Sequence, residues 1–344
     1  MNPTTSMIIL TSLATGTIIT ASSFHWFMAW IGLEMNTLAI IPIISKQHHP
    51  RSTEAATKYF LIQAAASALI LFSSMINAWH SGMWDMTQPT TPTSSILFTM
   101  AISMKLGLAP THFWLPEVLQ GTTMKTALII STWQKLAPMT LLYLTANSLS
   151  PHTLLLLGVL STCIGGWGGI NQTQTRKIMA YSSIAHFGWM AAIAPMSTNI
   201  MLLNLIIYTL MTTSMFSMLI TTKSKTIKNM TPTWTISPMM TSMTLLTLMS
   251  LGGLPPLSGF TPKWLILNEL THQNLIFTTL IMTMSTLLSL FFYLRLTYTT
   301  TLTLTPSTPN STHKWRFKPT THLLLTTTIP TTTLMLPITS TMIQ

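Results

Sequence analysis

The stretch SLGGLPPLSGFTPKWLIL, residues 250–267, interrupts an apolar run with adjacent glycines and adjacent prolines, and it contains Lys263. Glycine and proline both disfavour a helix interior, and proline also lacks the N–H that a helix needs. The surrounding run, residues 238–270, would be roughly 50 Å long as one straight helix, whereas the apolar core of a bilayer is about 30 Å thick. The stretch therefore predicts a helix that breaks inside a membrane, beside a positive charge.

The composition of the chain indicates a membrane protein. Of its 344 residues, 48% are hydrophobic and 6% are charged, whereas soluble domains have roughly 25% charged residues. The 16 basic residues exceed the 5 acidic ones, but they are spread between apolar runs and not gathered on a soluble face with aromatics, so no nucleic-acid partner is expected. The single cysteine, Cys163, cannot by itself form a disulfide or hold an iron–sulfur cluster. We expect no redox cofactor in this chain.

At about twenty apolar residues per crossing, the sequence predicts an all-α polytopic membrane protein with eleven transmembrane helices in a single membrane domain, residues 1–344. The predicted spans are residues 4–21, 24–44, 59–79, 94–120, 126–146, 150–171, 177–195, 199–220, 238–270, 275–297 and 322–343.

The loop charges support this count. Thirteen of the sixteen basic residues fall in alternate connections, and the intervening connections contain none. Basic loops mark the cytoplasmic or matrix side and favour contact with anionic lipids, so we place the N-terminus on that side and the C-terminus opposite. Most of the following tryptophans are expected to be interface anchors: Trp26, Trp30, Trp79, Trp84, Trp114, Trp264 and Trp315. The thirteen loop residues are Lys46, Arg51, Lys58, Lys125, Arg176, Lys177, Lys223, Lys225, Lys228, Arg295, Lys314, Arg316 and Lys318.

A second long span, residues 94–120, contains a similar break, KLGLAPTHFWLPE. Dividing the first ten spans into five and five places a broken helix fourth in each half. Because five is odd, the halves cross the membrane in opposite directions. The predicted inverted five-helix repeats are residues 1–146 and 150–297, followed by one C-terminal helix at 322–343. Inverted repeats with interrupted helices at corresponding positions indicate an ion or substrate path.

Four charged side chains lie deep within predicted spans, namely Glu34, Lys105, Lys135 and Lys263, whereas Glu117 and Glu269 lie near span ends. Each such charge costs about 2.5–3.5 kcal/mol on insertion scales. Burial disfavours the charged forms, whereas attraction between opposite charges favours them, so small changes in geometry can move a proton. The pattern predicts a proton relay; a static ion pair between Glu34 and a lysine is the alternative. The two halves correspond imperfectly, since Lys105 precedes its break and Lys263 follows its own.

Two histidines are candidate members of the same relay. His186 lies in the second span of the second half, and Glu34 lies in the second span of the first half. Titratable groups in the second span of both repeats favour a polar path that runs through the two repeats. The alternative is that His186 only forms a hydrogen bond to Ser182 or Ser183. His112 lies within the first break. Haem ligation by the two histidines is a third hypothesis.

Several motifs also carry a family resemblance. EMNTLAIIPI, EAATKYFLIQAAAS, MKLGLAPTHFWLPEVLQG, TWQKLAP, RKIMAYSSIAHFGWM and LSLGGLPPLSGFTPKW together resemble the chain 2 family of mitochondrial NADH-ubiquinone oxidoreductase, respiratory complex I, whose members are antiporter-like membrane subunits. The resemblance extends from end to end. It implies a glutamate at Glu34 with a lysine partner at Lys105, a central lysine at Lys135 and a distal lysine at Lys263, and it assigns roles to histidines less firmly.

The resemblance implies proton translocation across the mitochondrial inner membrane, with the N-terminus and basic loops in the matrix and the C-terminus in the intermembrane space. Electrons would pass from NADH to ubiquinone elsewhere, so NADH, FMN, iron–sulfur clusters and ubiquinone would belong to other subunits. Expected partners are the other membrane-arm subunits, including a neighbouring antiporter-like subunit, and phospholipids. Two other classes stay open: a stand-alone cation/proton antiporter, and a structural spacer that tolerates neutral replacement of all four buried charges.

Overall fold

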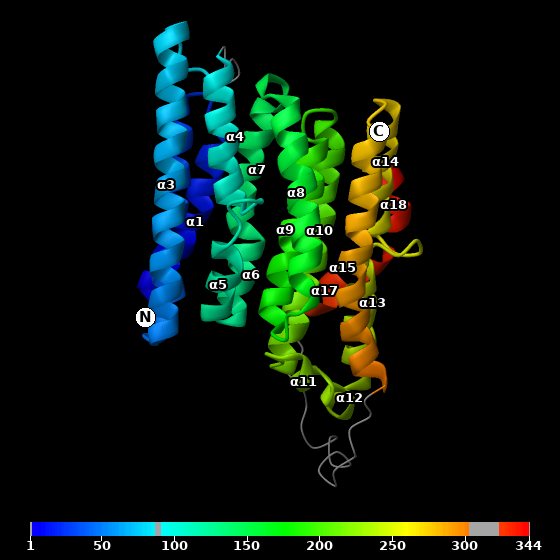
Figure 1. Cartoon of the computed structure of the whole chain (residues 1–344). Coiled ribbons are helices and arrows are strands. Elements are labelled where there is room, and N and C mark those ends of the chain that lie inside the picture. Colours follow the sequence, from blue (N-terminus) through cyan, green and yellow to red (C-terminus); the bar gives the residue numbers. More distant parts are fainter. Residues whose placement is uncertain (1, 87–90, 303–322, 344) are drawn as a thin grey trace. The chain divides into compact units, whose positions relative to one another are not determined.

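The computed structural model describes residues 2–86, 91–302 and 323–343. These residues are mostly α-helical, and no strand occurs among them (Figure 1). The chain forms two compact units, each described by itself. The first unit is Met1–Ser161 with Phe187–Thr198, and the second is Thr162–His186 with Asn199–Gln344.

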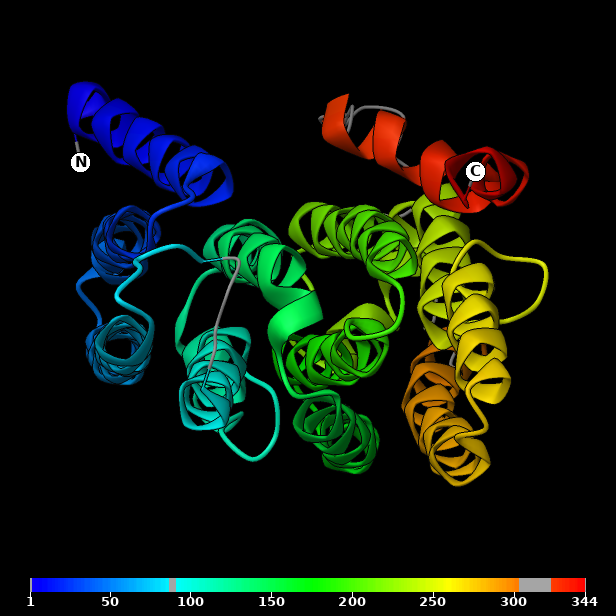
Figure 2. The ribbon, with the colours of Figure 1, turned by 90° about the horizontal axis from the view of Figure 1, so that it is seen from above.

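In the first unit, successive helices pack side by side: α1 on α2, α2 on α3, and α3 on both α4 and α5. α1 approaches α2 closely, because a Cβ on Gly32 would lie 2.8 Å from the carbonyl oxygen of Gly16. Figure 2 views most helices of this unit nearly end-on. Its helices are α1 (Pro3–Ser22), α2 (Trp26–Ile44), η1 (Ser45–Gln47), α3 (Pro50–Ser81), α4 (Pro92–Leu106), α5 (Trp114–Gly121), α6 (Met124–Ser131), α7 (Trp133–Thr145) and η2 (Ala146–Ser148).

Two helices contribute to both units, α8 (Pro151–Ile170) and α9 (Thr175–Ile193). In the second unit, α13 packs against α15 and α17, and α14 packs against α15. The remaining helices are α10 (Thr198–Thr222), α11 (Ile227–Met230), α12 (Thr233–Ile236), α13 (Pro238–Gly252), α14 (Phe260–His272), α15 (Ile276–Leu302), α17 (Leu323–Leu334) and α18 (Leu336–Ile343).

The chain leaves the helix at both places where the sequence predicts a break. α4 ends at Gly107 and α13 ends at Gly253, and both glycines adopt the left-handed conformation, with φ of 73° and 85°. In each case the glycine N–H and the next N–H bond back to the last turn, as in a Schellman motif. Glycine allows this conformation at no steric cost. The carbonyls at the end of the first half-helix are thereby left available to side chains.

Two further interruptions differ from the continuous spans predicted at residues 126–146 and 322–343. α6 and α7 are separated at Thr132, whose hydroxyl and N–H both bond to the Leu128 carbonyl, 2.7 and 3.0 Å away. Such back-bonding by threonine bends helices. α17 and α18 are separated at Met335, and the physical reason is Pro337, which cannot donate to the preceding turn and clashes with it.

The described helices are apolar in the manner of membrane spans. Six of them have an apolar stretch long enough to cross a bilayer: Pro3–Ser22, Trp26–Gln47, Pro50–Ser81, Pro151–Ile170, Thr198–Thr222 and Ile276–Leu302. The basic residues Lys314, Arg316 and Lys318, the tryptophan Trp315, and the first residue of the predicted span 322–343, lie outside the described residues. The count of eleven crossings stays a prediction.

Most of the described serine and threonine hydroxyls bond to carbonyls of their own helices. Along α13, for example, Thr244 donates to the Thr241 carbonyl at 2.7 Å, Thr247 to Thr244 at 3.0 Å and Ser250 to Thr247 at 2.7 Å. A hydroxyl that bonds to the preceding turn presents little unmet polarity to lipid, where every polar group must find a partner in the protein. This is how a chain rich in threonine can remain membrane-embedded.

Lys58 forms two exposed ion pairs, one with Glu54 within α3 and one with Glu117 that joins α3 to α5. Its Nζ lies 2.6 Å from Glu54 Oε1 and 2.7 Å from Glu117 Oε2, and the three side chains are 41%, 61% and 52% exposed. Exposed pairs contribute roughly 0.2–1 kcal/mol each. We expect Lys58→Met to lower the Tm of the purified assembly by less than about 2 °C, measured by differential scanning fluorimetry beside Lys125→Met, a change at another exposed lysine. A shift of many degrees would contradict this assignment.

Candidate functional site: two buried lysines at helix ends

Lys135 binds the end of a broken helix. The side chain extends from α7 and is 1% exposed, and its Nζ donates to the Leu106 carbonyl at 2.6 Å and to the Lys105 carbonyl at 3.5 Å. These are the last two carbonyls of α4, which have no partner within the helix because the helix stops there. The C-terminal end of a helix carries a partial negative charge and stabilises a cation. The break therefore supplies the acceptors that a buried ammonium group needs.

Two aromatic rings complete the surroundings of Lys135. Its Nζ lies 4.8 Å from the ring centroid of Trp114 and 5.6 Å from that of Phe187, within the range of cation–π attraction. Among the described residues, the ion pairs closer than 4 Å all involve Lys58. Carbonyl dipoles and aromatic faces, and not a contacting carboxylate, therefore surround the Lys135 amine.

The interpretation of Trp26 and Trp114 as interface anchors is wrong, since both side chains are 3% exposed. Trp114 is the first residue of α5, and its indole N–H donates to the Met104 carbonyl at 3.1 Å. That carbonyl belongs to the last turn of α4 and is available because α4 ends nearby. The break thus draws the indole inward, where it lies against Lys135. The sequence alone gives no sign of this role.

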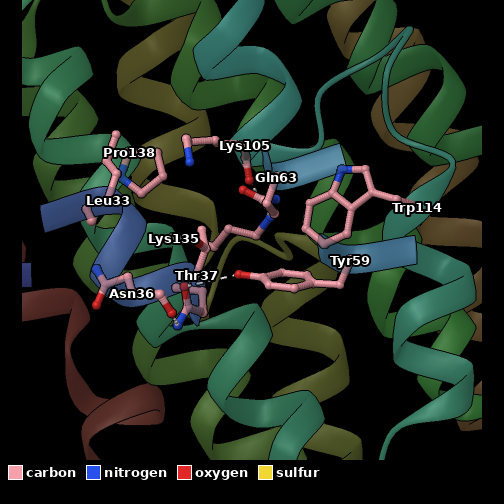
Figure 3. Close-up of a pocket in the computed structure, with 11 residues that line it drawn as sticks. Leu33, Asn36, Thr37, Tyr59, Gln63, Lys105, Trp114, Lys135 and Pro138 are labelled. Carbon is pink, nitrogen blue, oxygen red and sulfur yellow. Dashed lines mark hydrogen bonds between the residues drawn. The ribbon is translucent and has the colours of Figure 1, made fainter. Parts of the chain in front are cut away.

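Lys105 and Lys135 line one small polar cavity (Figure 3). Its volume is about 10 Å³, which is room for about one water molecule. The Nζ of Lys105 and both polar atoms of the Asn36 amide are buried without a hydrogen-bond partner, although buried polar groups are almost always bonded. The remaining residues around the cavity are Leu33, Thr37, Tyr59, Gln63, Trp114, Gln134, Ala137 and Pro138.

A chain of hydrogen bonds crosses this cavity between three helices. The Tyr59 hydroxyl on α3 donates to Gln134 Oε1 at 3.4 Å, and Gln134 Nε2 on α7 donates to the Asn36 carbonyl on α2 at 3.4 Å; the first bond is drawn in Figure 3. Tyr59, Gln134 and Asn36 were not predicted from the sequence as site residues, because charged side chains and histidines were considered as candidates. The available signal was the presence of uncharged amides, including Gln63, within apolar spans.

Glu34 lies beside this cavity but does not form a contact ion pair. Its Oε2 is buried without a hydrogen-bond partner. Its carboxylate interacts electrostatically with Lys105 and with Tyr59, yet no carboxylate oxygen lies within 4 Å of the Lys105 ammonium. A static, directly bonded Glu34–Lys105 pair is therefore absent from the described residues.

Lys263 repeats the arrangement of Lys135 in the second unit. It extends from α14 and is 9% exposed, and its Nζ donates to the Gly252 carbonyl at 2.9 Å and to the Leu251 carbonyl at 3.4 Å. These are the last two carbonyls of α13. In the sequence, Lys105 and Lys263 are the charges nearest the two breaks. By contact, however, the equivalent of Lys263 is Lys135.

His186 joins Lys263 at the same helix end. It is a buried residue of α9 that hydrogen-bonds to the Leu251 carbonyl and interacts electrostatically with Lys263. The hydroxyls of Ser182 and Ser183 donate to carbonyls one turn earlier in α9. The polar partner of His186 is thus the broken helix, and not the serines that the sequence offered as an alternative.

His112 is buried in the first break but lies outside the cavity lining. Its Nδ1 is 3.3 Å from the Pro110 carbonyl, and its ring centroid is 4.2 Å from that of Phe113. The structure does not bring it to Lys105 or Lys135. No cluster of three or more histidine, cysteine or acidic residues suited to a metal occurs in the described part of the chain.

Comparison with known proteins places this geometry in a family. A family model described as "NADH:quinone oxidoreductase/Mrp antiporter, TM" matches residues 23–289, and a model described as "NADH dehydrogenase subunit 2 C-terminus" matches residues 290–343. The chain is 58% identical over 316 residues to NADH-ubiquinone oxidoreductase chain 2 of Xenopus laevis, with 92% of each chain covered. This chain belongs to the NADH-ubiquinone oxidoreductase chain 2 family.

Other relatives agree with the chain 2 assignment along the whole length. The chain is 54% identical over 344 residues to NADH-ubiquinone oxidoreductase chain 2 of Polypterus ornatipinnis, covering 100% of this chain and 99% of that one. Its fold is similar to a chain of the respiratory complex I of Thermus thermophilus solved with bound aureothin, with a TM-score of 0.86 and 24% identity. That match covers 97% of this chain and 78% of the other. Together with the antiporter family model that matches residues 23–289, this likeness shows an antiporter-like membrane fold.

Within this chain 2 fold, α9 contributes one neighbouring side chain to Lys135 and one to Lys263. Phe187 lies against Lys135, and His186 interacts with Lys263. The two residues are consecutive in the sequence.

Proposed function

We propose that this chain moves protons through its buried lysines as a membrane subunit of H⁺-translocating NADH:ubiquinone oxidoreductase. Membership of the chain 2 family makes it a subunit of that multi-pass inner-membrane enzyme. The observation that carries the proton path is that Lys135 and Lys263 make the same kind of contact. Each donates to the last two carbonyls of a helix that is broken within an apolar run.

Both protonation states of these amines can be accommodated. Desolvation disfavours the ammonium form, whereas helix-end carbonyls and, for Lys135, the Trp114 ring favour it. The neutral amine retains N–H donors for the carbonyls and gains a lone pair that can accept a proton. Because these effects oppose each other, a small change at either lysine alters its proton occupancy. A contacting carboxylate would instead hold the charge in place.

Glu34 and Lys105 would start proton transfer along this path, because a movement of Glu34 changes the proton affinity of Lys105. Two unit charges attract by about 4 kcal/mol at 4 Å for an effective dielectric constant of 20, and by about half of that at twice the distance. A shift of Glu34 by a few ångströms thus changes the energy of a proton on Lys105 by about 2 kcal/mol, which is more than tenfold in an equilibrium constant. A conformational change in an adjacent subunit would supply the shift, and the cavity shared by Lys105 and Lys135 would transmit it.

From Lys135 the proton would pass by way of water and His186 to Lys263 and then leave the subunit. The support for this step is that α9 carries consecutive neighbours of both lysines. His112 remains a proposed member without a contact to the cavity.

The proposal retains eleven crossings in two inverted five-helix repeats, residues 1–146 and 150–297, with the N-terminus and basic loops in the matrix and the C-terminus in the intermembrane space. NADH, FMN, iron–sulfur clusters and ubiquinone would bind to other subunits, and the neighbours would be membrane-arm subunits, one of them antiporter-like.

The proposal is tested by removing the input charge. In Glu34→Gln, we expect assembled enzyme whose NADH-driven proton transport falls by up to about tenfold, since the carboxylate can no longer shift the proton on Lys105. Purified complex in liposomes gives the ratio of protons moved to electrons transferred, and Glu54→Gln, at an exposed carboxylate, is the matched control.

Different outcomes separate the competing functions. An unchanged ratio in Glu34→Gln, and in Lys105→Met, Lys135→Met and Lys263→Met as well, would identify the chain as a structural spacer. Ion exchange by the purified chain alone in liposomes would identify a stand-alone antiporter.

A further inference from the structure

A groove in the second unit runs between α13 and α15, away from both buried lysines. Its volume is about 600 Å³. Its walls are mainly apolar, and Phe291, Leu294 and Tyr298 are exposed side chains, so the groove opens to the surroundings of the unit. The residues that matter for its chemistry are Leu245, Met249, Phe291, Leu294, Arg295 and Tyr298.

Arg295 is the one charged group among the described residues that line this groove. Its Nη1 donates to the Ile170 carbonyl at 2.5 Å, which fixes the guanidinium in position. A guanidinium has five N–H donors, and it suits phosphate and carboxylate groups because it can donate two parallel bonds. Tyr298 follows three residues later, on the same face of α15. The groove thus combines a held cation with an apolar wall.

The depth of these residues matches the layers of a bilayer. Arg295 lies nineteen residues beyond the start of α15 at Ile276, which is about 28 Å along the helix and close to the full thickness of the hydrocarbon core. Phe291 lies one turn deeper. From the other wall, Leu245 and Met249 lie about 10 and 16 Å beyond the start of α13. The cation is therefore at headgroup level, and the apolar walls extend inward from it.

We propose that this groove binds one anionic phospholipid, with its phosphate on the Arg295 guanidinium and an acyl chain along Leu245, Met249 and Phe291. Basic pockets between helices on the matrix side suit such headgroups. The same end of the unit carries the exposed Lys225 and Lys228 just before α13, so an anionic headgroup meets a positive field there. This site involves neither the cavity of Lys105 nor the contacts of Lys263, so its test is separate from that of the proton path.

The test uses the whole purified complex in phosphatidylcholine nanodiscs that contain a phosphatidylglycerol with a photoactivatable acyl chain. We expect adducts on the α13 and α15 peptides that line the groove, suppressed by unlabelled phosphatidylglycerol and not by added phosphatidylcholine. Arg295→Leu should lower their yield about tenfold, whereas Lys125→Met, at an exposed lysine of the first unit, should leave it unchanged. Leu245→Trp, which fills the groove and keeps Arg295, should lower the yield as well.

Two results would overturn the proposal. One is an adduct yield that is the same in Arg295→Leu, Leu245→Trp and the parent complex. The other is the absence of lipid adducts together with cross-links from the groove to another subunit, which would mean that a protein helix fills it. Because adducts are read by mass spectrometry, neither result depends on proton transport.

Discussion

Replacing Lys135 with methionine should lower NADH-driven proton transport at least tenfold while the complex still assembles. Methionine fills a similar volume, so packing against Trp114 is retained, but no group remains to take up a proton. Loss of a positioned proton carrier typically costs a factor of about 10² or more in rate. The Leu106 carbonyl also loses its 2.6 Å hydrogen bond, which costs about 1–3 kcal/mol of stability. The measurement is proton uptake per electron by the complex in liposomes.

An arginine at this position separates proton transfer from a static charge. Lys135→Arg keeps the positive charge at the end of α4, but a guanidinium does not release its proton in proteins. The relay therefore predicts a loss like that of Lys135→Met, whereas a role as a fixed charge predicts near-normal transport. Lys125→Met, at an exposed lysine, is the control for expression and assembly. Normal stoichiometry in Lys135→Met would exclude this lysine from the proton path.

Replacing Gly259 with alanine should prevent normal assembly of the chain. A Cβ at this residue would overlap the carbonyl oxygen of Ser250 and lie 3.2 Å from the sulfur of Met211. The first of these is a backbone atom of α13 and cannot rotate away, so the start of α14 must separate from the end of α13. We expect a loss of about 3 kcal/mol or more. Native electrophoresis and the lifetime of the pulse-labelled chain measure the outcome.

Gly82→Ala is the matched control for this experiment. No atom lies within 4 Å of a Cβ there, although the residue has φ of 70°, so the expected cost is about 1 kcal/mol. In any Gly259→Ala complex that does assemble, displacement of α14 should also move Lys263 from the Gly252 carbonyl and reduce proton transport. Assembly of Gly259→Ala at the level of Gly82→Ala would show that the two half-helices are not held together by this contact.

The breaks were predictable because their cause is local. Gly107 with Pro110, and the paired glycines and prolines around residue 253, end a helix through backbone geometry and missing N–H groups, whatever the rest of the chain does. The interruption before α18 has the same kind of local cause, Pro337, and is therefore predictable from the sequence as well. The interruption at Thr132 was harder to predict from the sequence. Threonines that bond to the preceding turn occur along other helices of this chain without breaking them.

The sequence by itself determined that the chain is apolar and helical, that two helices break, and that Glu34, Lys105, Lys135 and Lys263 are ionisable groups within apolar runs. These follow from composition, spacing and the cost of burying charge, which are properties of short segments. Only the tertiary structure decided that Lys135, from a different helix, binds the end of α4, that Lys263 does the same for α13, and that Trp114 and His186 lie beside them. Those contacts join residues far apart in the chain, so they depend on how the helices pack.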